Sequence, residues 1–276
     1  MEAIYRFTAP TGPAAPLLVS VPHAGEDEPE DIQNALLTPH ARRKRDFDLY
    51  VDRFWRDAPQ HGAAFIVAKY SRYVLDLNRA PEDVDAGSVL DHPNPIGTYR
   101  RGLFWQVTAA GEPVQGAPLP QAAYAARVAT YHQPYHAKLE ATLAQIQDQF
   151  GHVLLIDAHS MPSVGRDDHP DPGQVRADIV PGTNLGRACP PDLVALCVDT
   201  FSAHGFSVAV DQPYKGGWIT RHYGQPAAKR FALQIEVSRR VYMEEETFAI
   251  KDEGVAKLRA ACQDFMGRAA AWRPGH

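Results

Sequence analysis

The chain has 276 residues, 45% of them hydrophobic, and this size predicts one large buried core in a single α/β domain over residues 1–276. Its formal net charge of −5 comes from 28 basic and 33 acidic residues that form no basic block. That balance argues against a nucleic-acid partner and favours small-molecule chemistry.

The cysteines and the first residues of the chain indicate a cytoplasmic protein. Cys189, Cys197 and Cys262 are odd in number and form no C-x-x-C pair, as expected of reduced thiols, which argues against a structural zinc knuckle. The N-terminus lacks a basic and apolar leader, and no apolar run approaches the roughly 18 residues of a membrane span. We therefore expect a soluble, cytoplasmic protein without a membrane partner and leave its oligomeric state open.

Apolar runs and helical spacings alternate through the first half of the chain. Runs at 17–21, 63–67 and 73–77 predict buried strands, and apolar residues at helical spacing over 47–55 predict a helix. Residues 83–120 are rich in Gly and Pro and show little periodicity. We interpret them as a long surface loop of the kind that forms a pocket wall.

The second half continues this alternation, which predicts a sheet covered by helices on both faces. A helical pattern covers residues 121–150, where Pro134 predicts a kink or a split. A polar loop is expected over 162–182. The remaining predicted elements are strands at 153–156, 206–210 and 231–237 and helices at 191–204 and 253–271.

Four polar motifs lie at or just past the ends of apolar runs. Because the carboxyl ends of parallel strands meet at one edge of a sheet, residues far apart in the sequence are expected to gather there. The motifs are Pro22-His23-Ala24-Gly25-Glu26, Leu77-Asn78-Arg79, Asp157-Ala158-His159-Ser160 and Gln234-Ile235-Glu236-Val237.

His23 and His159 occupy matching positions after two apolar runs, which favours a shared metal site over two isolated surface residues. Two neutral imidazoles and one carboxylate are a typical catalytic zinc set, with a fourth position open for water. The carboxylate is left open at this point. Glu26 lies in an acidic stretch that also fits a solvated loop, whereas Asp48 or Asp52 also fits a helix cap or first-turn charge.

Glu236 and Arg79 each have a functional and a structural interpretation. Glu236 lies inside an apolar run, where an unpaired carboxylate is costly, so it is either a general base or the partner of a cation such as Arg239. Arg79 follows Asn78 at a predicted strand end. Its guanidinium fork suits a substrate carboxylate, with pairing to a protein acid as the alternative.

Six segments together resemble the N-formylglutamate amidohydrolase family, from about residue 16 to residue 245. This resemblance implies a three-layer α/β/α fold with a central mixed, mostly parallel sheet, similar to zinc-dependent exopeptidases. The segments are Val19-Ser20-Val21-Pro22-His23-Ala24-Gly25, the helix with Asp48 and Asp52, Ser71-Arg72-Tyr73-Val74-Leu75-Asp76-Leu77-Asn78-Arg79, Tyr131-His132-Gln133-Pro134-Tyr135-His136, Asp157-Ala158-His159-Ser160 and Gly216-Gly217-Trp218-Ile219-Thr220-Arg221-His222-Tyr223-Gly224.

The resemblance implies zinc-dependent hydrolysis of N-formyl-L-glutamate to formate and L-glutamate, a step of histidine degradation. One Zn²⁺ would be held by His23, His159 and a carboxylate, with Glu26 favoured by the carboxypeptidase pattern and Asp27 and Asp48 also eligible. Glu236 would be the general base. The two carboxylates of the substrate would be bound by Asn78 with Arg79 and by Arg221, with Arg72 as a further candidate.

Other functions and other residues rank lower. A related zinc acylase or carboxypeptidase, or a metal-free binding protein of the same fold, is the alternative to the deformylase. His132 and His136 flank Pro134 and are interpreted as helix-surface or pocket-wall residues. Ser160 lacks the G-x-S-x-G surroundings of a nucleophile.

Overall fold

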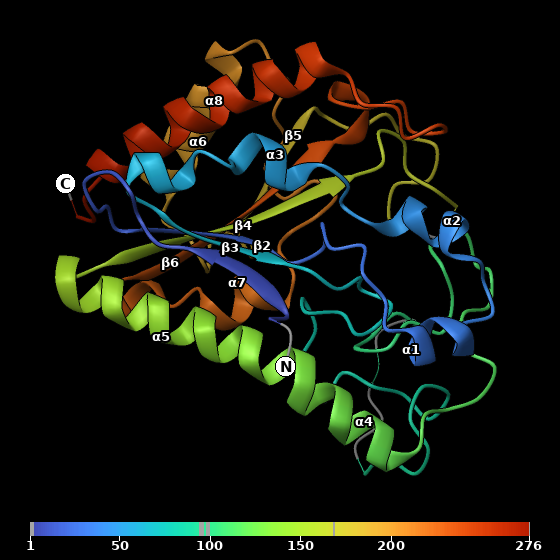
Figure 1. The fold of residues 1–276 in the computed structure, drawn as a ribbon. Coiled ribbons are helices and arrows are strands. Elements are labelled where there is room, and N and C mark those ends of the chain that lie inside the picture. The colour runs from blue at the N-terminus through green and yellow to red at the C-terminus, as the bar shows by residue number, and fades with distance from the viewer. Residues whose placement is uncertain (1–2, 94–96, 98–99, 168, 276) are drawn as a thin grey trace. The chain divides into compact units, whose positions relative to one another are not determined.

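The computed structural model describes residues 3–93, 97, 100–167 and 169–275 and divides them between two compact units (Figure 1). The first unit comprises Met1–Arg6, Pro22–Leu49 and Ala68–Glu140, and the second comprises Phe7–Val21, Tyr50–Val67 and Ala141–His276. Each unit is therefore built from three separate stretches of chain. A single domain over residues 1–276 stays a prediction.

The sheet has six strands in the order β1-β3-β2-β4-β6-β5. β2 is parallel to β3 and to β4, β4 is parallel to β6, and β5 runs antiparallel to β6. The predicted mixed, mostly parallel sheet is thus confirmed. The strands are β1 (Tyr5–Thr8), β2 (Leu17–Val21), β3 (Ala64–Ala68), β4 (Val153–Met161), β5 (Ile179–Gly182) and β6 (Arg230–Ser238).

The central strands are buried along their whole length, as expected of parallel strands covered on both faces. β2, β3 and β6 coincide closely with the predicted runs. β4 is longer than the predicted 153–156 and continues to Met161. His159 therefore lies within a strand and pairs with Glu236 of β6, and does not follow the strand as we expected.

Helices cover both faces of the sheet in the second unit, which confirms the three-layer architecture (Figure 1). On one face α8 packs against α3 and α6, and on the other α7 and the later part of α5 cover β4 and β6. These helices are α3 (Val51–Trp55), α5 (Gln133–Phe150), α6 (Pro191–Ala203), α7 (Trp218–Tyr223) and α8 (Asp252–Ala271). Short 3₁₀ turns are η2 (Ala58–His61), η4 (Pro226–Ala228) and η5 (Arg239–Val241).

The first unit consists mainly of loops and short helices. The predicted interruption of the long helix is a π-helical turn, η3 (Val128–His132), and Pro134 is the second residue of the helix that follows it. The remaining helices of this unit are α1 (Glu30–Ala35), α2 (His40–Arg43), η1 (Lys44–Asp46) and α4 (Gln121–Arg127).

The polar loop predicted over 162–182 is too long, because its last four residues form the buried strand β5. Three other predicted elements are wrong or too long. The segment 73–77 is a buried turn, because local bonds from Val74 N to Ser71 O and from Asn78 N to Asp76 Oδ1 replace strand pairing. The helix predicted over 47–55 begins only at Val51, after Tyr50 with a φ of 67°. The strand predicted at 206–210 is a single bridge at Val208.

Candidate active site

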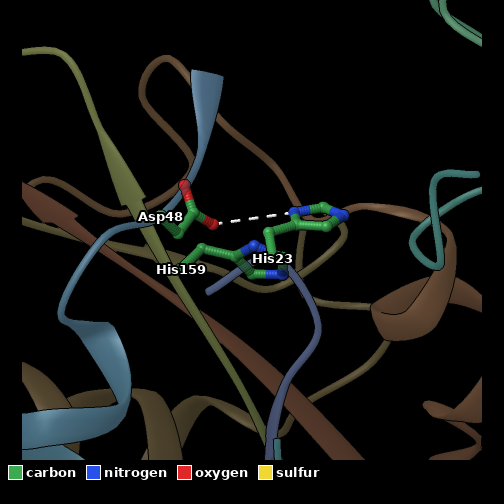
Figure 2. A group of neighbouring side chains, drawn as sticks. All are labelled: His23, Asp48 and His159. Carbon is green, nitrogen blue, oxygen red and sulfur yellow. Dashed lines mark ion pairs between the residues drawn. The ribbon is translucent and has the colours of Figure 1, made fainter. Parts of the chain in front are cut away.

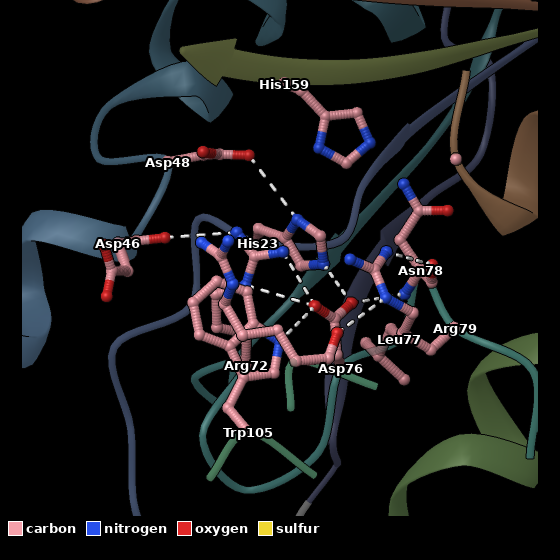
Figure 3. Close-up of polar contacts among 12 residues, drawn as sticks. His23, Asp46, Asp48, Arg72, Asp76, Leu77, Asn78, Arg79, Trp105 and His159 are labelled. Atoms are coloured by element: carbon pink, nitrogen blue, oxygen red, sulfur yellow. Dashed lines mark hydrogen bonds and ion pairs between the residues drawn. The ribbon is translucent and has the colours of Figure 1, made fainter. Parts of the chain in front are cut away.

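His23 lies between two buried carboxylates of the first unit, Asp48 (Figure 2) and Asp76 (Figure 3). Its Nε2 lies 2.7 Å from Asp76 Oδ1, and its Nδ1 lies 3.6 Å from Asp48 Oδ2. The backbone N–H of Asp48 also donates to the carbonyl of His23 at 3.0 Å, which ties the two segments together. One carboxylate therefore orients the ring, and the second faces the other ring nitrogen.

Asp76 is fully buried and accepts hydrogen bonds on both oxygens (Figure 3). Oδ2 accepts from Arg72 Nη2 at 2.7 Å and from Trp105 Nε1 at 3.0 Å, and Oδ1 accepts from the backbone N–H of Asn78. Burial works to raise the pKa of Asp76, yet the charges of Arg72, His23 and Arg79 hold it well below its usual value. An ionised carboxylate can only accept a hydrogen bond, so Asp76 accepts from His23 Nε2, and the Nδ1 side of the ring faces Asp48.

Arg72, a predicted substrate ligand, is placed as the partner of Asp76. Its guanidinium lies 4.3 Å from the centroid of the Trp105 ring, donates to Asp76, and also donates to the carbonyl of Asp46 at 3.2 Å. Burial lowers the pKa of Arg72, but the charges of Asp76 and Asp48 outweigh it and raise the pKa. Within the first unit, Arg72 therefore orients Asp76, and Asp76 in turn orients the ring of His23.

Arg79 is oriented by backbone carbonyls. Its Nη1 donates to the carbonyl of Asn78 at 2.9 Å (Figure 3). Its Nε donates to the carbonyl of Arg101 at 3.0 Å and forms an ion pair with Asp83 Oδ2 at 3.7 Å. The two carbonyls orient the guanidinium. Its ion pair with Asp83 is the pairing with a protein acid that the sequence left open as the alternative. His132 Nε2 lies 3.0 Å from the carbonyl of Arg79 and this histidine is buried, so it is not a helix-surface residue.

The other acidic candidates for the metal site differ sharply in burial. Glu26 is exposed and its Oε2 lies 2.7 Å from Lys44 Nζ, and Asp27 is exposed as well. These two carboxylates behave as the solvated loop that the acidic stretch also suggested. Asp48, in contrast, is 2% exposed and lies beside His23.

The second unit contributes two parallel columns of polar residues on β4 and β6. Asp157 pairs with Gln234 and His159 pairs with Glu236. Residues two apart in a strand share a face, so the four side chains lie on the same face of the sheet. His159 Nε2 lies 2.9 Å from Asp157 Oδ1, and Gln234 Nε2 donates to Glu236 Oε1 at 2.9 Å.

Arg239 and Tyr214 are two further residues of the second unit that were considered as a partner of Glu236 or are affected by its charge. Arg239, the alternative cation for Glu236, is buried and its Nε donates to Ser160 Oγ at 3.3 Å. Tyr214 accepts from Arg176 Nη1 at 3.2 Å. Burial raises the pKa of Tyr214 and the charge of Glu236 raises it further, whereas Arg176 lowers it.

The Gly216-Gly217-Trp218 segment leads into α7, and both are hydrogen-bonded to side chains of β4 and β6. Gly216 has a φ of 108°, a conformation suited to glycine, and the backbone N–H of Gly217 donates to Gln234 Oε1 at 2.7 Å. Thr220 Oγ1 donates to Asp157 Oδ2 at 3.3 Å. Arg221, on the same helix, is exposed.

Sequence reasoning missed three residues that lie against functional candidates: Asp76 beside His23, Asp157 beside His159 and Gln234 beside Glu236. Asp76 had a detectable signal, because a charged residue inside the run Tyr73-Val74-Leu75-Asp76-Leu77 requires a compensating partner. Asp157 and Gln234 precede His159 and Glu236 by two residues and carry no such signal without the strand register.

The protein has a mostly parallel α/β sheet, and its buried polar residues include two histidine–carboxylate pairs and a glutamate. These features are typical of α/β hydrolytic enzymes. The sequence model of the N-formylglutamate amidohydrolase family matches residues 15–243. The chain belongs to this family.

Individual relatives agree with this assignment. The chain is 34% identical to the N-formylglutamate deformylase of Pseudomonas aeruginosa and 33% identical to that of Pseudomonas putida, over 93% of each chain. The solved structure of N-formylglutamate amidohydrolase from Ralstonia eutropha is 31% identical, with a TM-score of 0.89 over 98% of both chains. A protein of Agrobacterium tumefaciens, at 17% identity and a TM-score of 0.71, shares the fold.

Among the described residues, no helix has both the length and the apolar character needed to cross a membrane.

Proposed function

We propose that this protein hydrolyses N-formyl-L-glutamate to formate and L-glutamate with one divalent metal ion, Zn²⁺, held by His23, His159 and Asp48. The observation that carries the proposal is the placement of His23, with Nε2 on Asp76 and Nδ1 beside Asp48. The named deformylases at 33% and 34% identity support the substrate.

The donor set suits a zinc ion. Each of the three residues offers one ligand atom, and all are buried (Figure 2). His23 Nε2 lies 2.7 Å from Asp76 Oδ1, which leaves Nδ1 for the metal. His159 Nε2 lies 2.9 Å from Asp157 Oδ1, which accepts no hydrogen bond. Two imidazoles and one carboxylate match the usual ligands of catalytic zinc.

The strand register supports including His159 in the same site. β2 and β4 are parallel neighbours, and Ser20 pairs with Asp157. His159 follows this pair by two residues in one strand, and His23 follows it by three residues in the chain that leaves the other. Chain connectivity alone therefore supports bringing the two imidazoles to the same edge of the sheet.

Glu236 is the proposed general base. When bound, a zinc ion in such a site polarises a carbonyl oxygen and makes water more acidic. Glu236 would remove a proton from the water that attacks the formyl carbon and deliver it to the amino nitrogen of the departing glutamate. Its strand pairing with His159 and its burial at 8% exposure support this role.

The two carboxylates of the substrate require two cationic contacts. Arg79, oriented by the carbonyls of Arg101 and Asn78, would bind one carboxylate together with Asn78. Arg221 would bind the other. Arg72 would support the site indirectly through Asp76, because its guanidinium already donates to that carboxylate.

We place this reaction in histidine degradation, as the family resemblance implies, and in the cytoplasm. The three cysteines, which are free and buried, support a reducing compartment.

The test is an assay of the purified protein against N-formyl, N-acetyl and N-succinyl amino acids, with added zinc and after chelation. We expect turnover of N-formyl-L-glutamate above all others, lost on chelation and restored by zinc. Preference for another acyl group would establish a related acylase. Stoichiometric zinc binding without any turnover would contradict the enzyme, and full activity after complete chelation would contradict the metal.

A further inference from the structure

Gln234 lies between Glu236 and the start of α7, and it contacts both. The backbone N–H of Gly217 donates to Gln234 Oε1 at 2.7 Å, and Gln234 Nε2 donates to Glu236 Oε1 at 2.9 Å. Gln234 is only 3% exposed. All three residues belong to the second unit, so their relation does not depend on the first.

The two hydrogen bonds determine which way the amide of Gln234 points. An amide side chain has one oxygen that accepts and one NH₂ group that donates. Because the N–H of Gly217 occupies the oxygen, the NH₂ group must face Glu236. Gln234 therefore offers a buried donor to a carboxylate, an interaction stronger than one between neutral groups.

We infer that Gln234 is a positioning residue that fixes the carboxylate of Glu236 for proton transfer and ties its orientation to the Gly216–Gly217 turn. This inference rests on the proposed function, in which Glu236 is the general base.

The start of α7 gives this connection a second anchor. Thr220 donates to Asp157 at 3.3 Å, and Gly217 donates to Gln234. Asp157 and Gln234 are register partners that lie two residues before His159 and Glu236. The segment that begins at Gly217 and continues into α7 therefore contacts both Gln234, the neighbour of the proposed base, and Asp157, the neighbour of the proposed ligand His159.

The test is a double-mutant cycle between Gln234→Met and Glu236→Gln in the zinc-loaded full chain, with N-formyl-L-glutamate as substrate. Met has nearly the length of Gln but no N–H donor. We expect Gln234→Met alone to lower kcat by about 10- to 100-fold, the value of a hydrogen bond to a charged group, with KM and zinc content unchanged. In the Glu236→Gln background the same change should alter kcat by less than about 2-fold.

A matched control comes from Gln263, whose Nε2 donates to Asp57 Oδ2 at 2.8 Å. Gln263→Met removes the same type of hydrogen bond elsewhere in the second unit and should leave kcat unchanged. If Gln234→Met does not fold, Gln234→Leu serves instead, because it also lacks a donor to Glu236 and introduces no charge beside it.

The outcomes separate this inference from the proposed function. A slow Glu236→Gln with a normal Gln234 variant would overturn the positioning role and leave the base assignment intact. A Gln234 effect of equal size in both backgrounds would make that residue merely structural and would also overturn the inference. A normal kcat in Glu236→Gln would overturn the base assignment and the inference together.

Discussion

Asp76 accepts a hydrogen bond from His23 Nε2 at 2.7 Å while its other oxygen accepts one from Arg72 at 2.7 Å. The same carboxylate therefore connects an imidazole to a guanidinium inside the first unit. Its charge is stabilised by Arg72 and Trp105, so it remains available to hold one tautomer of His23.

Asp76→Asn should weaken zinc binding by about 10- to 100-fold, the usual effect of removing a carboxylate behind a histidine ligand. Competition with a chelator of known affinity measures this change. Asp178→Asn is the matched control, since Asp178 accepts from Arg240 at 2.8 Å outside the proposed site. Equal zinc affinity in the Asp76 variant and the wild type would show that His23 is not oriented in this way.

Asp48→Asn and Glu26→Gln distinguish the two acidic candidates for the third zinc ligand. Both changes remove a charge and preserve shape, but only Asp48 is buried beside His23. We expect elemental analysis to show loss of stoichiometric zinc in Asp48→Asn and full zinc in Glu26→Gln. The reverse pattern would restore Glu26 as the ligand favoured by the carboxypeptidase resemblance.

Arg79→Lys and Arg221→Lys should each lower kcat/KM by roughly 10-fold or more, because an ammonium cannot reproduce a bidentate contact with a carboxylate. Substrates in which one carboxylate is replaced by an amide complete the test. Each Arg→Lys change should lower kcat/KM much less for the substrate whose matching carboxylate is an amide. That substrate should be a different one for Arg79→Lys than for Arg221→Lys. Arg268→Lys on α8 is the control. If every Arg→Lys change lowered kcat/KM by the same factor for the amide substrates as for N-formyl-L-glutamate, neither arginine would contact the substrate.

Asp57 should make folding stability depend on pH in the acid range. Its hydrogen bond to Arg259 lowers its pKa, with burial opposing and Gln263 assisting. A lowered folded-state pKa means that the stabilisation is complete above the unfolded-state value near 4 and is lost as the pH falls through the folded-state value.

Comparison of wild type with Asp57→Asn measures this contribution. We expect the variant to be less stable by roughly 1–3 kcal/mol at pH 7. The difference in the free energy of unfolding should shrink as the pH falls below about 4. A difference that does not change with pH would assign the loss to packing.

The sequence predicted those parts of the fold that depend on hydrophobic runs. The strands around Leu17–Val21 and Ala64–Ala68 and the helix ending at Ala271 were found because their apolar patterns are regular. The strand expected at 73–77 was wrong because a buried turn is as apolar as a strand. Only the bonds of Ser71 and Asp76 distinguish the two.

The candidate site divides in a similar way. His23 and His159 could be singled out because polar residues at the ends of apolar runs are uncommon. The choice between Glu26 and Asp48 could not be made from spacing, since it depends on which carboxylate is buried beside the ring. Asp157 and Gln234 required the pairing of β4 with β6.

The extension of β4 through His159 has a consequence for local opening. His159 and Glu236 lie in paired strands, whereas His23 and Asp48 lie outside strands and helices. Fluctuations that expose amides without global unfolding are therefore expected first around His23 and Asp48. Bound zinc should slow hydrogen exchange in those loops far more than in β4 and β6, so metal loss begins where the backbone is least restrained.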